Sequence, residues 1–496
     1  MWEANVTNPI TYVTQISYLL FLKMLEEMDA DQKEAGNGNH KNRFGMVKVG
    51  NREINFEPLR WSVLTSDPDN ERMLRTLRDT LPQFAEHPFL SQGARAIFEN
   101  ASIVIPTGAT LRRAVDIISP ISFMAEDADV KGDLFEILSS DLGSQKKAAQ
   151  FRTPRHLIRV ITEMVDPKIG VTICDPACGT GGFLIAAYEH ILLANTSPDL
   201  VRETIGPYGL LVRRGIGDKL KRSQWDFLQK GSLHGFESDQ EILRMAAMNP
   251  VLHQFDYSPL VHRDSICGAE DKWDEVQFDI ILENPPFSGA RSDAKRSLRI
   301  EKGDKYVLFL AHALRSLRPG GRAGIIFPNG ILFGDTNSHI EVKHRLLKEF
   351  DLQAVVNLPK GMFEPYTPNP TCFFIFQKTG RPTENVWFYR LEGDGSSLKK
   401  ARKFGPHYRN DFPDLLEKWP ERKIEEKRAW RVPARLIEEK NFNMTLSELG
   451  LVEPEKVEHS QPEEILESVA VKEARIFDLI REMKELLIEG NGNGKI

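Results

Sequence analysis

The chain has 496 residues, and its 65 Lys and Arg against 71 Asp and Glu give a formal net charge of −6 at pH 7. This length suggests about two to four domains, and a composition that is 41% hydrophobic and 27% charged argues against wholesale disorder, collagen and a membrane bundle. The apolar run Tyr18–Leu22 is too short to span a bilayer, and no signal peptide precedes it. Four cysteines in so long a chain do not make a disulfide scaffold, so we expect a reducing, cytoplasmic environment.

Residues 1–145 are predicted to form a mostly helical domain. From Pro9 to about Ala30 the apolar residues recur at steps of three and four, which is typical of one amphipathic helix. The polar, Gly- and Asn-rich stretch Lys33–Asn51 is typical of a loop. Further helical patterns lie at Met73–Leu81, Leu111–Ile117 and Leu134–Leu138.

Residues 146–380 show a different pattern, in which short apolar runs alternate with amphipathic stretches. These runs are Val171–Cys174, Leu233–Phe236, Phe278–Leu282, Ala323–Phe327, Ala354–Leu358 and Cys372–Phe376. The alternation is typical of βαβ units, so it predicts an α/β domain with a largely parallel sheet. Within it, residues 314–327 are expected to form a helix, a glycine stop and a strand.

Residues 381–496 are polar and show no clear sheet pattern. Ser460–Glu463 is typical of a capping box that opens a helix at about residues 460–489. The residues of this helix that fall close to heptad positions are Val469, Ile476, Leu479, Met483 and Leu486. Such a stripe either packs back on its own domain or pairs with helices of another protein, and no partner for it is evident within the chain.

The stretch Asp175–Phe183 is the most informative one for a cofactor. A strand ends at Asp175, three glycines follow within four residues, and a helix begins near Phe183, so a ligand can approach the backbone at a helix N-terminus. It is not a P-loop, because no Lys-Ser/Thr pair follows the glycines. Asp175 suits a ligand that carries an ammonium group, and Glu237, at the end of the next strand, lies where such folds bind ribose hydroxyls.

Two other interpretations of this stretch exist. It is either a tight structural connection or, through Cys174 and Cys178, part of a metal site, but further metal ligands are lacking and no metal is predicted. The insertion between about Ser197 and Lys230 has no function that the sequence indicates.

A rigid loop follows the strand Phe278–Leu282, because two consecutive prolines fix φ and remove two backbone donors. The amide oxygen of Asn284 and the carbonyl of Pro285 can accept both hydrogens of a planar amine, while the Phe287 ring stacks on the ring that bears it. This geometry directs the lone pair of the amine toward an electrophilic methyl group. The structural alternative is a proline-stiffened turn in which the asparagine caps a helix.

Together these motifs resemble those of amino-group methyltransferases that use S-adenosylmethionine. More closely, they resemble the DNA adenine-N6 methyltransferase (modification) subunit of type I restriction-modification systems. The resemblance covers about residues 10–380 and follows that family's order of motifs: residues 150–155, Asp175–Phe183, Glu237, the weaker Asp264-Ser265, and Asn284–Phe287. It departs at Ala149 and Arg152, where the family usually has Gly and an aromatic residue.

The resemblance implies a Rossmann-like methyltransferase core with an N-terminal helical domain and a C-terminal helical tail. It implies that S-adenosyl-L-methionine meets Gln150, Phe151, Arg152, Thr153, Pro154, Arg155, Asp175, Gly179, Thr180, Gly181, Gly182, Glu237 and Asp264. It assigns the adenine, flipped out of double-stranded DNA, to the catalytic residues Asn284, Pro285, Pro286 and Phe287. The implied partners are a separate specificity subunit, with two modification subunits for each, and a restriction subunit.

Charge patterning bears on DNA binding as well. Six cations and three acids lie in the loop at residues 291–305, which either contacts DNA phosphates or is an ordinary solvated segment. Residues 399–403 form a second basic run.

The alternative functions are N4-cytosine, RNA or protein-glutamine methylation, whose families use related loops. A non-catalytic scaffold of a defence complex is a further alternative, but the complete set of Asp175, Glu237, Asn284 and Phe287 argues against it.

Overall fold

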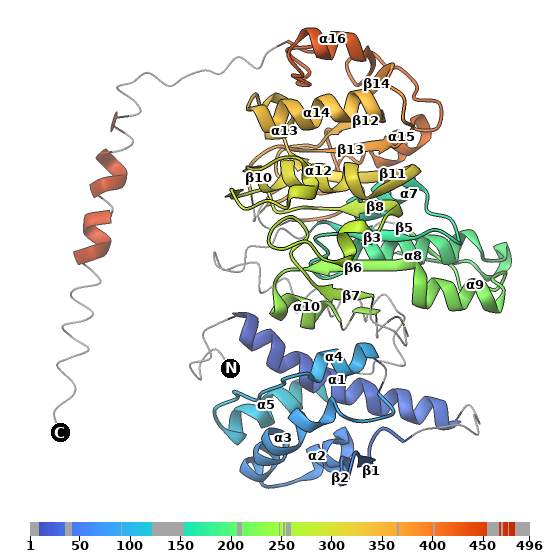
Figure 1. Ribbon diagram of the computed structural model, residues 1–496. Helices are drawn as coiled ribbons and strands as arrows, with labels where there is room; N and C mark the ends of the chain where they lie inside the picture. Colours follow the sequence, from blue (N-terminus) through green and yellow to red (C-terminus); the bar gives the residue numbers. More distant parts are fainter. Residues whose placement is uncertain are drawn as a thin grey trace. The chain divides into compact units, whose positions relative to one another are not determined.

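The structure is a computed structural model that describes residues 9–34, 42–90, 92–121, 153–205, 211–247, 249, 250, 253, 259–364, 367–399, 402–453, 466, 467, 470–474 and 476–481. Its contacts divide the chain into two units, residues 1–449 and 450–496. In the first unit a group of helices is followed by a large sheet with helices on both faces (Figure 1). None of the described helices is long and apolar enough to cross a membrane.

The N-terminal part is helical, as predicted. Its helices are α1 (Pro9–Glu34), α2 (Trp61–Ser66), α3 (Asn70–Phe84), α4 (Gln92–Phe98) and α5 (Gly108–Ile118), and they share one apolar core. Two of them begin at capping side chains: Asp69 accepts from the backbone N–H groups at the start of α3, and Thr107 does so for α5. The helical pattern at Leu134–Leu138 lies outside the described residues.

The prediction of a loop over Lys33–Asn51 is wrong in its last residues. A hairpin of β1 (Met46–Val49) and β2 (Arg52–Asn55) lies there, and the side chain of Val47 in β1 is buried. Gly50 supplies the positive φ of +59° that the tight turn needs. Four-residue strands next to Gly and Asn are too short to give a recognisable alternation.

A nine-stranded sheet forms the body of the first unit. Its order is β15-β14-β12-β13-β11-β8-β3-β6-β7. The strands are β3 (Ile173–Asp175), β6 (Leu233–Glu237), β7 (Leu260–His262), β8 (Phe278–Glu283), β11 (Leu317–Pro328), β12 (Asp351–Asn357), β13 (Thr371–Gln377), β14 (Asn385–Arg390) and β15 (Ala429–Pro433). All six predicted strands are therefore confirmed. The sheet is mixed, because β13 runs antiparallel to β11 and β12, and β15 runs antiparallel to β14.

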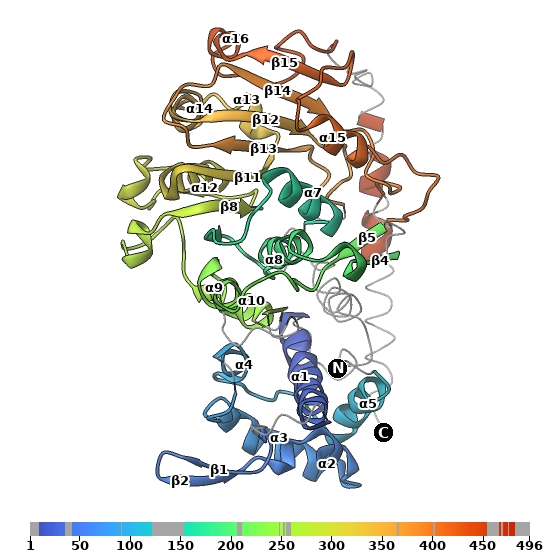
Figure 2. The ribbon, with the colours of Figure 1, turned by 90° about the vertical axis from the view of Figure 1, so that its right-hand side faces the viewer.

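Helices cover both faces of this sheet. Figure 2 shows α7 (Arg155–Val165), α8 (Gly182–Ala194) and α15 (Phe412–Lys418) on one side, and α12 (Lys305–Ser316) and α14 (Asn337–Glu349) on the other. The first three helices bury their apolar residues in one core with β3 and β8. The insertion between β3 and β6 contains a hairpin, β4 (Arg202–Ile205) and β5 (Leu211–Arg214), and the short helix α9 (Arg222–Phe227).

Two predictions about the sheet are corrected by the structure. The expected glycine stop at residues 319–321 is an irregularity inside β11, whose register against β8 shifts between Leu317 and Arg322. The expected absence of strands after residue 380 is wrong, because β14 and β15 extend the sheet through Pro433. The predicted end of the methyltransferase domain therefore falls within the sheet.

The second unit contains helical residues at 466–467, 470–474 and 476–481. The large apolar side chains described there are exposed: Leu466, Val471, Ile476, Phe477, Leu479 and Ile480. Part of the predicted C-terminal helix is thus confirmed. Ser460–Glu463, Val469, Met483 and Leu486 lie outside the described residues.

Candidate active site at the carboxyl ends of the strands

The predicted cofactor and catalytic motifs meet at one edge of the sheet. Strands β8, β3 and β6 are parallel neighbours, so their carboxyl ends lie side by side. Those ends carry Glu283, Asp175 and Glu237, and the Asn-Pro-Pro-Phe loop directly follows β8. Ligands of open α/β sheets bind at this edge.

The glycine-rich turn leaves open space beside its backbone. Gly179 and Gly181 have φ values of +52° and +79°, and a Cβ atom built on either would meet nothing within 4 Å. The backbone N–H of Cys178 donates to Phe236 O at 2.9 Å, which ties the turn to the neighbouring strand. Helix α8 then begins at Gly182. A ligand can therefore approach this backbone closely, which fits a bound cofactor.

Two buried carboxyl groups flank the turn. Burial raises the pKa of Asp175 well above its ordinary value, although the carboxyl accepts a hydrogen bond from the Ala177 N–H at 3.2 Å. Burial also raises the pKa of Glu237, whose Oε2 accepts from the Gly179 N–H at 3.1 Å and whose Oε1 accepts from the Asp239 N–H at 2.9 Å. Glu237 thus holds the turn in place while lying at the strand end predicted to bind ribose.

Side chains from distant segments support the same turn. Asn249 Nδ2 donates to Thr180 O at 2.9 Å, and Ser265 Oγ donates to Pro176 O at 2.7 Å. Asp264 Oδ1 accepts from the N–H groups of Ile266 and Cys267, so this carboxylate shapes its own loop. Asn249 was not predicted, because a lone Asn before a proline carries no signal that distinguishes it from a turn residue.

The structure brings together two motifs that lie 131 positions apart. Asn284 Nδ2 donates to Thr153 Oγ1 at 2.8 Å. Pro154 is the N-cap of α7 and Arg155 is its first residue, whereas Gln150, Phe151 and Arg152 lie outside the described residues. The first cofactor motif therefore contacts the catalytic loop through its threonine.

The catalytic loop presents a partly accessible surface. Pro285 is buried, Asn284 and Phe287 are half-buried, and Pro286 is exposed. The rings of Phe287 and Phe363 lie 5.7 Å apart at an interplanar angle of 71°, an edge-to-face contact that supports the Phe287 ring from one side. Phe363 comes from the turn after β12.

Glu283, which directly precedes Asn284, is fully buried at 0% exposure. Neither of its carboxyl oxygens has a hydrogen-bond partner among the described residues. Burial, and then the nearby charge of Asp175, raise its pKa well above the ordinary value, which favours the neutral form of the carboxyl group. Its sequence neighbours gave no reason to single it out.

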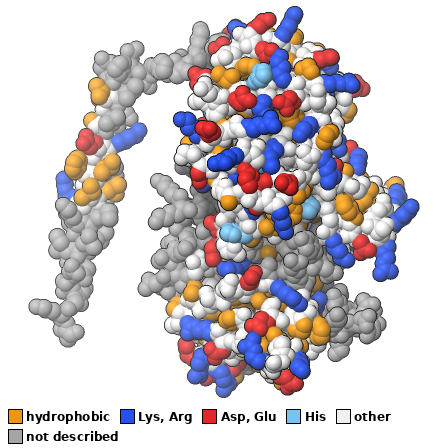
Figure 3. All heavy atoms as spheres, viewed as in Figure 1, with side chains coloured by type: hydrophobic (Ala, Val, Ile, Leu, Met, Phe, Trp, Pro, Cys, Tyr) orange, Lys and Arg blue, Asp and Glu red, His pale blue; other side chains and the backbone are white. Residues whose placement is uncertain are grey.

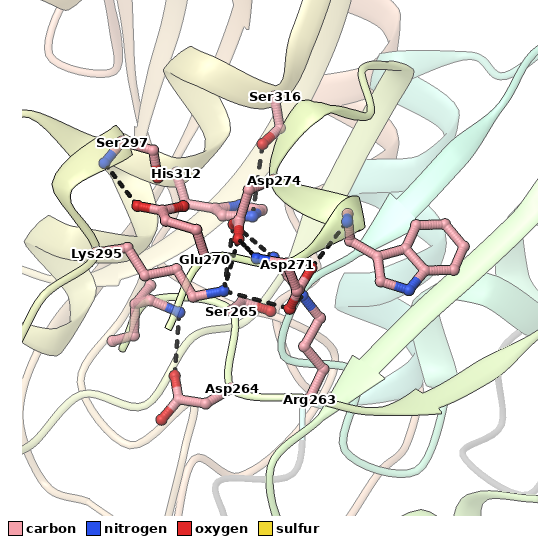
Figure 4. Close-up of polar contacts among 12 residues, drawn as sticks. Arg263, Asp264, Ser265, Glu270, Asp271, Asp274, Lys295, Ser297, His312 and Ser316 are labelled. Atoms are coloured by element: carbon pink, nitrogen blue, oxygen red, sulfur yellow. Dashed lines mark hydrogen bonds and ion pairs between the residues drawn. The ribbon is translucent and has the colours of Figure 1, made fainter. Parts of the chain in front are cut away.

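A buried ion cluster fixes the segment that follows the catalytic loop (Figure 4). Lys295 Nζ lies 3.0 Å from Asp274, and Arg263 contacts Asp274 at 2.6 Å and Asp271 at 2.8 Å. Lys295 is only 2% exposed, so it is not among the cations of this loop that are accessible to DNA phosphates. Arg291 is paired with Asp293 at 2.7 Å. Among the cations of this loop, Arg296, Arg299 and Lys302 are the exposed ones.

Within the described part of the chain, no group of three or more His, Cys, Asp or Glu side chains could hold a metal ion. The site instead combines an open glycine turn, an acid at the next strand end, and an Asn-Pro-Pro-Phe loop held by a threonine. This combination on a Rossmann-like sheet defines an S-adenosylmethionine-dependent methyltransferase.

The comparisons with known proteins identify the family. Residues 126–459 match the model of N-6 DNA Methylase, and residues 1–118 match that of the HsdM N-terminal domain. The chain belongs to the N-6 DNA methylase family.

Individual relatives agree with this assignment. The chain is 28% identical to the type I restriction enzyme EcoEI methylase subunit of Escherichia coli, over 98% of this chain and 94% of the relative. It is 25% identical to the EcoKI methylase subunit of Escherichia coli K12, over 81% and 71%.

Solved structures show the same fold. A chain from a structure of the type I R-M system matches with a TM-score of 0.66 and 25% identity, over 99% of this chain and 95% of that chain. A modification subunit of a putative type I restriction enzyme from Vibrio vulnificus YJ016 matches with a TM-score of 0.60 and 23% identity, over 87% and 88%.

Proposed function

We propose that this chain is the modification subunit of a type I restriction-modification system. It transfers a methyl group from S-adenosylmethionine to the N6 amino group of adenine in DNA, and a separate specificity subunit selects the sequence. The family and the near full-length similarity to a type I methylase subunit support the assignment. The structural observation that carries it is the hydrogen bond from Asn284 to Thr153 beside the glycine turn.

This hydrogen bond fixes the orientation of the catalytic amide. The amide nitrogen faces Thr153, so the amide oxygen is turned away from it and can accept a hydrogen from the adenine amine. The carbonyl of Pro285 accepts the second hydrogen, and the Phe287 ring, supported by Phe363, stacks on the extruded base. Both acceptors are in place before the reaction, so they contribute without reorganisation.

The cofactor supplies the electrophilic methyl group. We assign its binding to the residues that surround the open turn, with Gly179–Gly182 along the backbone, Glu237 accepting from ribose hydroxyls, and Asp175 facing the ammonium group. The remaining residues of this assignment are Gln150, Phe151, Arg152, Thr153, Pro154, Arg155 and Asp264.

The chain divides into three functional parts in this proposal. Residues 1–145 form the helical domain, and the methyltransferase domain begins at residue 146. It continues past residue 380, because β14 and β15 belong to its sheet. Residues 450–496 then serve assembly with the specificity subunit.

Transfer of labelled methyl groups to DNA tests the proposal. The chain is assayed alone and with a type I specificity subunit, and the product nucleoside is identified by mass spectrometry. We expect N6-methyladenine from the assembled complex and a much lower rate of its formation when Asn284 is replaced by alanine. N4-methylcytosine as the product, or methylated RNA or protein in place of DNA, would establish one of the alternative substrates.

A further inference from the structure

The segment at residues 391–412 lies beyond the predicted methyltransferase domain, yet it packs against the first turn of α7. His156 Nε2 lies 2.8 Å from Asp394 Oδ2, and Asp394 is completely buried. The rings of Phe404 and Phe412 pack edge-to-face on His156 at 5.5 and 5.4 Å. The start of α7 is therefore held by residues that no predicted motif contains.

Arg402 joins this contact to a third segment. Its guanidinium forms an ion pair with Asp394 and donates from Nη1 to the Met362 carbonyl at 3.0 Å. Ser396 Oγ completes the cluster by donating to Asp394 Oδ1 at 2.7 Å. One carboxylate thus contacts the start of α7, Ser396 and Arg402, and Arg402 joins it to the turn that contains Met362.

Close backbone packing reinforces the attachment of that turn. Gly361 has a φ of +86°, and a Cβ built there would lie 2.2 Å from Leu398 O. Only glycine fits such a position. The turn at residues 361–364 is therefore pressed directly against the segment that carries Arg402.

Two connections lead from this cluster to the catalytic loop. Thr153, three residues before His156, accepts the hydrogen bond from Asn284. Phe363, next to Met362, makes the ring contact with Phe287. The two side chains that handle the adenine are thus supported by elements that meet at Asp394.

The cluster is built to remain charged. Burial opposes ionisation of Asp394, but the hydrogen bond from His156 and the charge of Arg402 outweigh it and hold the pKa of this carboxyl at about 2. Burial lowers the pKa of His156, although its hydrogen bond to Asp394 opposes this shift. The Asp394–Arg402 pair therefore persists over the whole physiological pH range.

We propose that Asp394, His156 and Arg402 are positioning residues that hold Asn284 and Phe287 in their reactive arrangement. Arg402 acts inside the protein, although it belongs to a basic run that the sequence made a candidate for DNA phosphates. The inference rests on the proposed methyltransferase function, since positioning matters only if this loop handles the target base.

The variant Arg402→Met in the assembled complex tests the proposal, with Lys403→Met as a matched control. Lys403 is the next cation of the same run after Arg402, and it is exposed. We expect Arg402→Met to lower kcat on the order of 10- to 100-fold, because small misplacements of reacting groups have effects of this size. Its KM for DNA and the salt dependence of DNA binding should stay near those of the wild type. Lys403→Met should leave kcat unchanged.

Arg402→Lys keeps a cation beside Asp394, but one ammonium group cannot also bridge Ser396 and Met362 as the guanidinium does. We expect a folded protein with a kcat between those of the wild type and Arg402→Met. If Arg402→Met does not fold, this variant carries the test, and a wild-type kcat would overturn the proposal. A reduced DNA affinity and salt slope with normal kcat in Arg402→Met would also overturn it.

The methyltransferase function and the positioning role are contradicted by different results. A wild-type complex that does not methylate DNA contradicts the proposed function itself. An active wild type whose Arg402 variants keep full kcat contradicts only the positioning role. Cofactor binding by calorimetry and the thermal midpoint of each variant separate loss of fold from loss of positioning.

Discussion

Asn284 carries the chemistry at the scale of single residues, and its replacement gives the sharpest prediction there. Asn284→Ala removes one of two acceptors on the target amine, and we expect the methylation rate to fall by about 10²–10³. Cofactor affinity, measured by calorimetry, should not change. Thr153→Val, which removes the partner of the amide but not the amide, should lower the rate less. A variant Asn284→Ala with near-normal turnover would remove this residue from the mechanism.

Glu283 predicts a pH dependence of stability. Its pKa is about 4.5 in the unfolded chain and well above that in the folded chain, so folding takes up a proton between these values. The stability of the wild type therefore decreases as the pH rises through this window. Glu283→Gln is neutral at every pH and lacks this decrease.

Urea unfolding of the wild type and of Glu283→Gln at several pH values shows whether stability changes with pH in the expected direction. The stability of Glu283→Gln relative to the wild type should increase with pH, by about 1.4 kcal/mol per pH unit at most. Asp175 contributes a decrease of the same sign in both proteins, and its charge interacts with that of Glu283 only in the wild type. Parallel stability curves for the two proteins would mean that Glu283 ionises normally.

The sequence predicted the site residue types better than their contacts. Asp175, Glu237 and Asn284 could be placed because each follows a recognisable strand, and the carboxyl ends of parallel strands converge. The hydrogen bond from Asn284 to Thr153 joins residues 131 positions apart, and the contact from Asn249 spans 69 positions. Such contacts depend on the order of strands and on loop paths, which local patterns do not contain.

At the scale of elements, the glycine turn allows a test with an internal control. Gly181 and Gly380 both have positive φ values, +79° and +67°, and a Cβ at either would meet nothing within 4 Å. Aspartate at either position should therefore cost a similar backbone strain, about 1–2 kcal/mol. Only Gly181→Asp places a carboxylate in the space beside the cofactor turn.

We expect Gly181→Asp to abolish binding of S-adenosylmethionine in calorimetry and Gly380→Asp to leave it intact. Thermal unfolding shows whether both variants lose comparable stability. Unchanged cofactor affinity in a folded Gly181→Asp protein would refute the assignment of the turn to the cofactor.

Elements were predictable where an apolar run was bounded by polar residues. The strands missed in the C-terminal region show the limit. Val386–Tyr389 in β14 is an apolar run, but it lies past the segment covered by the family resemblance. The neighbouring strand β15 contains Arg431, and it pairs with another strand on one side only. An edge strand of this kind lacks the hydrophobic pattern that marks buried strands.

At the scale of the whole molecule, the point to decide is which surface recognises the DNA sequence. On the face of the sheet-bearing part seen in Figure 3, Lys and Arg side chains are interspersed with Asp and Glu. With Lys295 and Arg402 engaged in internal ion pairs, each basic run has fewer cations left for phosphates. The residues after position 380 that form β14 and β15 belong to the sheet of the first unit. We expect the choice of sequence to come from a partner that contacts base edges.

The exposed apolar side chains of the second unit are the surface we expect this partner to cover. Deletion of residues 461–496 should leave cofactor binding intact, because the candidate site lies within residues 1–449. It should impair assembly with the specificity subunit and sequence-specific methylation. The point variant Ile476→Glu puts a charge among these apolar residues and should weaken assembly in the same direction, whereas Glu473→Gln, at an exposed polar position, should not.

Size-exclusion chromatography with the specificity protein measures assembly, and labelled methyl transfer measures its consequence. An apolar helix face that pairs with another protein loses affinity when a charge must be buried in the contact. Normal complex formation by the deleted chain would place the contact elsewhere. Sequence-specific methylation by the isolated full-length chain would contradict the requirement for a specificity subunit altogether.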